Sequence, residues 1–105
     1  MANRLRGEVE AVLDGERRTL CLTLGALAEL ETALKADDLG ALARRFGEGR
    51  LKAREAIAVI GAGLRGAGQA VGDDEVAAMR IDGGAAGFVR LVGQLLEATF
   101  EGGEA

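Results

Sequence analysis

The spacing of apolar residues changes once along the chain, and this change constrains the fold more than any other feature. Residues 7–13 alternate between apolar and polar side chains, and residues 17–22 resume that alternation. Between them lies Asp14-Gly15, a pair that tolerates the positive φ angles of a two-residue hairpin turn. Cys21 falls on the outer face, as a small buried or half-buried residue. The expected inner face comprises Val9, Ala11, Leu13, Leu20 and Leu22.

Beyond residue 23 the apolar residues recur every three or four positions, which is typical of one face of a helix. Thr23 can cap a first helix that ends near Ala36. Asp37 or Asp38 can cap a second, which Gly47-Glu48-Gly49 ends. The expected apolar stripes of these two helices are Leu24, Leu27, Leu30 and Leu34, then Leu39, Leu42 and Phe46.

Three more helices are expected, over residues 53–65, 74–80 and 85–100. The acidic segment Asp73-Asp74-Glu75 suits the start of the middle one, because carboxylates stabilise a helix N-terminus. A calcium loop would need alternating ligands and a late Glu, which are missing here. The expected apolar faces are Ile57, Ile60, Gly61 and Leu64 in the first of the three, and Phe88, Leu91, Val92, Leu95, Leu96 and Phe100 in the last.

The sequence therefore predicts an α+β fold, in which an N-terminal β-hairpin is followed by a bundle of four to five short helices and the content is mostly α. A hairpin alone is marginal in water, so it must dock on the helices or pair with another chain. With 105 residues, one domain over 1–105 is expected, ordered from about 3 to 100, with 101–105 as a frayed tail. Aromatic residues make up only 3%, so Leu, Val, Ile and Ala must build the core.

Composition argues against most chemistry. The chain has no His, which removes the commonest general base, zinc ligand and partner of a nucleophile. We therefore expect no enzyme activity and no catalytic, cofactor-binding or metal-binding residue. A net charge of −4 gives no support for nucleic-acid binding. The single Cys precludes an internal disulfide, and there is no signal peptide or membrane span, so a cytoplasmic protein without membrane contact is expected.

One motif resembles a nucleotide site. Gly61, Gly63 and Gly66 form a Gly-x-Gly-x-x-Gly pattern, with Asp82 near the spacing of a ribose-binding acid. However, residues 54–58 are strong helix formers, and the chain breaks again soon after the motif. A helix that uses small residues for close packing is the favoured interpretation. The basic run Arg44, Arg45, Arg50, Lys52 and Arg54 is interpreted as a solvated face, with an acidic partner protein as the alternative.

Several segments occur in an order that resembles a known family. After the hairpin come TLGALAELE at 23–31, LGALARRFGEGR at 39–50, AGLRGAG at 62–68 and DDEVAAM at 73–79, then a last helix rich in small residues. As an ordered set over about residues 3–100, they resemble the gene transfer agent family of small tail proteins, which is similar to phage tail assembly chaperones. The Ala, Gly and Arg-rich composition resembles that of an alphaproteobacterial host.

The resemblance implies that the protein is a non-enzymatic tail assembly chaperone of a gene transfer agent, which acts within the producing bacterial cell. The expected partners are the tape measure protein and the tail tube protein, and a homo-oligomer is possible. A structural, tube-associated tail component is the alternative, because some family members carry a tail tube label; an unrelated protein-binding module or toxin-system partner is a third. Since such proteins bind through surface area, the last helix is the expected partner-binding element or part of the core, through Phe88, Leu91, Leu95 and Phe100.

Overall fold

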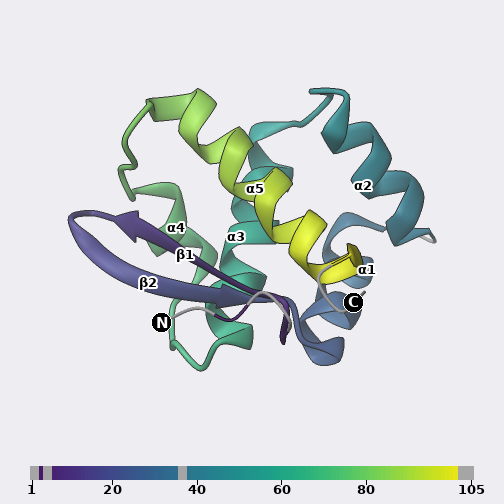
Figure 1. The fold of residues 1–105 in the computed structure, drawn as a ribbon, viewed down its shortest axis with the longest axis horizontal. Coiled ribbons are helices and arrows are strands. Elements are labelled where there is room, and N and C mark those ends of the chain that lie inside the picture. Colours follow the sequence, from purple (N-terminus) through teal and green to yellow (C-terminus); the bar gives the residue numbers. More distant parts are fainter. Residues whose placement is uncertain (1–2, 4–5, 36–37, 102–105) are drawn as a thin grey trace.

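The computed structural model describes residues 3, 6–35 and 38–101, and the side chains of these residues except Glu101. Their order is two strands followed by five helices, as the spacing of the apolar residues predicts. Figure 1 shows the hairpin on one side of the molecule and α2 on the opposite side, with α3 and α5 between them. The α+β prediction is confirmed.

The hairpin consists of β1 (Glu8–Leu13) and β2 (Glu16–Cys21), paired antiparallel with Leu13 opposite Glu16. Asp14 and Gly15 have φ angles of 53° and 78°, so both adopt the left-handed conformation that this tight turn requires. Four of the five residues expected on the inner face are buried, and Ala11 is half-buried. Cys21 is also half-buried on the other face, as predicted.

Helices α1 (Leu24–Leu34) and α2 (Leu39–Gly47) have the predicted caps. The Thr23 hydroxyl accepts from the Ala26 amide at 3.1 Å, and an Asp38 carboxylate oxygen accepts from the Ala41 amide at 3.1 Å. Helix α1 ends at Leu34, and Lys35 closes it in a left-handed conformation; the alternative boundary residues Ala36 and Asp37 lie outside the described residues.

The sequence places four residues on the apolar stripe of α1, and for one of them the prediction is wrong. Leu24 is 85% exposed, because it occupies the first turn of the helix, whereas Leu30 is buried and the two remaining members of the stripe are half-buried. In α2 only Phe46 is buried, and its two companions are half-buried.

The next helices are α3 (Ala53–Gly66), α4 (Asp73–Ala77) and α5 (Gly84–Glu101). Helix α4 ends earlier than the predicted Arg80. The chain leaves the helix there because Arg80 bonds the hairpin turn: its carbonyl accepts from the Asp14 amide, and its amide donates to the Asp14 carboxylate, both at 2.9 Å. Helix α5 includes Glu101, which the sequence predicts to belong to the frayed tail; residues 102–105 of that tail lie outside the described residues.

Helix α3 is the centre of the packing and contacts β2, α1, α4 and α5. Its three glycines are helical, so the Gly-x-Gly-x-x-Gly pattern forms no phosphate-binding loop. A Cβ atom on Gly63 would lie 2.8 Å from Leu95 Cδ2, and one on Gly66 would lie 2.0 Å from the Cys21 carbonyl oxygen. These glycines therefore allow α3 to approach α5 and β2, which is the close-packing role that the sequence predicts.

Candidate protein interface

Helix α5 has two different apolar faces. Leu91, Val92 and Leu95 point into the core and are at most 2% exposed. On the other side of the helix, Val89 is 41% exposed and Phe100 is 44% exposed. These two account for half of the large hydrophobic side chains that are exposed in the described part of the chain. Helix α5 thus contributes both to the core and to an apolar surface.

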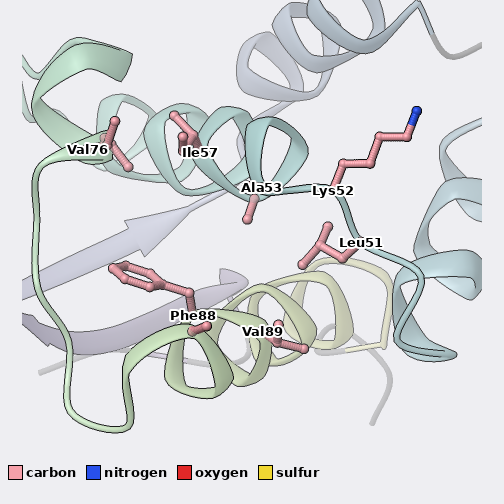
Figure 2. Close-up of a pocket in the computed structure, with 10 residues that line it drawn as sticks. Leu51, Lys52, Ala53, Ile57, Val76, Phe88 and Val89 are labelled. Atoms are coloured by element: carbon pink, nitrogen blue, oxygen red, sulfur yellow. The ribbon is translucent and has the colours of Figure 1, made fainter.

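An apolar pocket of about 320 Å³ borders the N-terminal half of this surface. Figure 2 shows Phe88 and Val89 of α5 on one wall, facing Ile57 of α3 and Val76 of α4. Lys52 stands at the rim with its ammonium group directed away from the pocket. The polar groups that would orient a small ligand are therefore few, so the pocket suits an apolar side chain of another protein better than a metabolite.

A second depression, of about 420 Å³, follows along the same face of α5 towards its C-terminus. Gly93, Leu96, Glu97 and Phe100 form one wall of it. The other wall comes from α2 and includes small residues and one cation: Gly40, Ala43, Arg44 and Gly47. Because a glycine or alanine leaves the helix backbone close to the surface, this depression can admit a bulky apolar group between α2 and α5. We call the two depressions together the α5 groove.

The basic run next to the groove is only partly a solvated face. Glu55 is 8% exposed, and Arg45 holds it with two hydrogen bonds, from Nη1 to Oε1 at 3.2 Å and from Nη2 to Oε2 at 2.5 Å. The Lys52 amide donates to the same carboxylate at 2.9 Å. These donors, with Arg45 first, lower the pKa of Glu55 although its burial acts in the opposite direction. Arg45 is therefore a structural residue that the interpretation as a solvated face misplaced.

Arg44 and Lys52 behave differently, since neither forms an ion pair with another described residue. The Lys52 side chain acts on Glu55 through its charge, which lowers the pKa of Glu55 less than the hydrogen bond from the Lys52 backbone amide does. Arg44 borders one depression of the α5 groove and Lys52 borders the other. The two depressions are thus bordered by two cations, Arg44 and Lys52, and by the carboxylate of Glu97.

The outer edges of the hairpin also differ from each other. The register directs the backbone groups of residues 8, 10 and 12 away from β2, and those of residues 17, 19 and 21 away from β1. On β2, Gln69 donates a side-chain hydrogen bond to the Thr19 carbonyl at 3.0 Å. On β1, the outward groups of Glu10 and Val12 have no hydrogen-bond partner among the described residues. The edge of β1 is therefore open, whereas that of β2 is partly covered.

The four predicted partner-binding residues separate into two pairs. Phe88 is half-buried and lines the first depression, and Phe100 is exposed and lines the second. Leu91 and Leu95 belong to the core, which is the other role that the sequence allowed them. The sequence analysis missed Val89 and Gly93. Val89 lies four residues before Gly93, and Gly93 lies seven residues before Phe100, so all three share one face of the helix.

The acidic residues at the start of α4 and the single cysteine have structural surroundings. Glu75 accepts from the Gly72 amide at 3.2 Å and so caps α4, while Asp73 accepts from Arg65 at 3.0 Å. Burial raises the pKa of the Cys21 thiol, which makes it a weaker nucleophile. No group of three or more potential metal ligands occurs among the described residues. None of the helices in the described ranges is long and apolar enough to cross a bilayer.

Comparison with known proteins gives one family. Residues 6–102 match the model of the family described as "Phage tail tube protein, GTA-gp10". This match covers all seven elements of the fold, from the start of β1 to the end of α5. No curated protein sequence and no solved structure matches the chain. The resemblance to a gene transfer agent tail protein is thereby confirmed at the level of the family.

Proposed function

Since the chain belongs to the phage tail tube protein family GTA-gp10, we propose that it is a structural component of the tail of a gene transfer agent particle. It acts by assembling with other tail proteins and catalyses no reaction. The observation that carries this proposal is the family match, which extends over almost the whole chain rather than one motif. Assembly takes place in the cytoplasm of the producing bacterium.

Two surfaces of the molecule support a role in assembly. The open edge of β1 offers unpaired backbone groups at Glu10 and Val12, and such an edge can accept a strand from another chain. The α5 groove offers an apolar surface with Val89 and Phe100 exposed. Both surfaces suit contacts between proteins, since interfaces combine an apolar centre with a polar rim.

The test is mass analysis of purified particles from producing cells, with the protein quantified against the other tail components. We expect the protein in many copies per tail. Deleting its gene should give particles without normal tails, and supplying the wild-type chain should restore them. A protein that is needed for tails but is missing from finished particles would contradict a structural role.

The second candidate is an assembly chaperone that holds the tape measure protein or the tail tube protein before the tail is complete. The observation that favours it is the helical fold, because the described residues contain only one two-stranded sheet and so offer little strand surface for a tube wall. A chaperone of this kind should keep co-expressed tape measure protein soluble and be absent from particles. The same two measurements therefore separate the candidates.

A further inference from the structure

We propose that strand β1 pairs with β1 of a second copy of this chain, so that two hairpins form one four-stranded antiparallel sheet. The twofold axis of this pairing passes between Ala11 of one copy and Ala11 of the other. The inference rests on the proposed function in one respect, because a tail component present in many copies brings identical edges together. It deepens that function by naming the partner strand and its register.

The open part of the β1 edge is short and has a definite end on each side. The outward backbone groups of Glu10 and Val12 have no hydrogen-bond partner among the described residues. The outward amides on either side, of Glu8 and Asp14, already donate within the chain, at 3.0 and 2.9 Å. Backbone donors and acceptors at strand spacing match those of another extended strand, so the partner that fits is a strand with two outward residues available.

A second copy of β1 offers an edge of the same length. When Ala11 faces Ala11 of the second copy in an antiparallel pair, Glu10 of each copy lies opposite Val12 of the other. Each of these two pairs exchanges two hydrogen bonds, so every outward group of both residues finds a partner. Ala11 then occupies a position where the Cα atoms of opposite residues lie about 4.5 Å apart, and its small side chain allows that approach.

Other arrangements of the same strands are less favourable. A shift by two residues in one direction places Glu10 opposite Glu10 of the second copy, and like charges in direct opposition destabilise a sheet. A shift in the other direction would need the amide of Asp14, which is already occupied. On β2 the Thr19 carbonyl accepts from Gln69, so β1 is the freer edge. Pairing of identical edges is symmetric, and it therefore closes at a dimer.

The space beside the open edge is accessible. Two depressions, of about 270 and 620 Å³, border it and share Val12, Ile81 and Asp82, so they form one continuous surface. Val12 is 46% exposed, and the second copy would cover part of it. A lining with charges of both signs gives no strong field that would repel a second copy. The charged residues that line the two depressions are Arg80, Arg90, Glu10, Asp14 and Asp82.

The first test is disulfide formation across the twofold axis. The variant Ala11→Cys/Cys21→Ser places a single thiol where the opposite Cα atoms lie within the range of a disulfide. We expect the purified protein to form a disulfide-linked dimer on mild oxidation. Arg17→Cys/Cys21→Ser is the matched control, because the Arg17 side chain is 79% exposed on the other strand and would meet a second copy only by random collision. This control should remain mostly monomeric.

A second variant removes hydrogen bonds between the copies without disturbing the hairpin. The Val12 amide points away from β2, so Val12→Pro leaves the pairing of β1 with β2 intact. By symmetry it removes two of the bonds between the copies, and the dissociation constant of the dimer should rise at least about tenfold. Val12→Thr keeps the amide and the branched side chain, and it should dimerise as the wild-type protein does. Sedimentation equilibrium measures each constant, since the dimer has twice the 10.8 kDa mass of the chain, and circular dichroism shows that both variants fold.

The inference would be overturned by a wild-type protein that sediments as a monomer at all concentrations, or by equal disulfide formation at positions 11 and 17. Dimerisation of Val12→Pro with the wild-type constant would also overturn it, since the backbone bonds would then be unnecessary. The proposed function fails separately, if the wild-type protein is missing from particles. A dimer in solution combined with that absence would retain the strand pairing and remove only the structural role in the tail.

Discussion

The two faces of α5 are both apolar, yet they meet different demands. On the inner face, Leu91, Val92 and Leu95 pack against α3 and the hairpin, where the side chains are almost fully buried. The outer face carries Val89, Gly93 and Phe100 beside two depressions, where side chains remain in contact with solvent. The comparison indicates that changes on the inner face should alter stability, whereas changes on the outer face should alter assembly.

The largest effect should follow truncation of the inner face. Leu95 is fully buried and lies beside Gly63, so Leu95→Ala would leave a cavity and lower the free energy of unfolding by about 3 kcal/mol. Urea unfolding followed by circular dichroism measures this. Val89→Ala is the matched control on the outer face, with an expected loss below about 1 kcal/mol. Equal losses at the two positions would remove the distinction between the faces.

A glycine pair sharpens the same comparison. Gly63→Ala should destabilise the fold by about 1–3 kcal/mol, because the new methyl group would overlap Leu95 and approach Leu20. Gly93→Ala has open space around it within the helix, so it should stabilise the fold by about 0.5–1 kcal/mol through helix propensity. Thermal unfolding of both variants measures the difference. The two changes in stability should have opposite signs; a stabilising Gly63→Ala would show that the inner face is loosely packed.

The pH dependence of stability should report on the ion pair between Glu55 and Arg45. The pKa of Glu55 lies below its usual value because Arg45 donates to it, so its contribution is present above the pKa of an unfolded glutamate. That contribution is lost as the pH falls through the lower, folded pKa. Glu55→Gln should lower stability by about 1–2 kcal/mol at neutral pH and make the loss in acid less steep. Urea midpoints measured between neutral and acidic pH would show this, and parallel curves for both proteins would contradict it.

The inner face of α5 could be predicted from the sequence, because apolar residues that repeat at helical spacing are usually buried. The hairpin turn could also be predicted, because the pair Asp14-Gly15 strongly favours a two-residue turn. Leu24 shows the limit of this reasoning, because a position in the first turn shares the spacing of the stripe but not its burial. The early end of α4 depends on a contact with Asp14, 66 residues away, which no local pattern contains.

The candidate interface was predicted only in part. Phe88 and Phe100 stand out as aromatic residues in a chain that has three, so the sequence identified them. Val89 and Gly93 lie on the same surface, but a valine and a glycine within a helix have no distinctive signal. Separating Leu91 and Leu95 from these residues required the position of α3, because only the packing partner decides which side of an apolar helix is covered.

The smallest effect on stability should come from polar changes on the outer face. The variant Val89→Asp/Phe100→Asp should unfold within about 1 kcal/mol of the wild-type protein, because both side chains are already exposed. Leu24→Asp is the control, because Leu24 is an apolar residue of another helix, α1, that is even more exposed. Circular dichroism and thermal unfolding would establish that all three proteins fold.

The most direct test of the account is to supply each of these folded proteins to cells that lack the gene and to count its copies in purified particles by quantitative mass analysis. The account predicts that the wild-type protein and Leu24→Asp are incorporated in many copies per tail, while Val89→Asp/Phe100→Asp falls at least about tenfold. Incorporation of the double variant at the wild-type level would contradict the assignment of this face to assembly, and absence of the wild-type protein would contradict its role as a structural tail component.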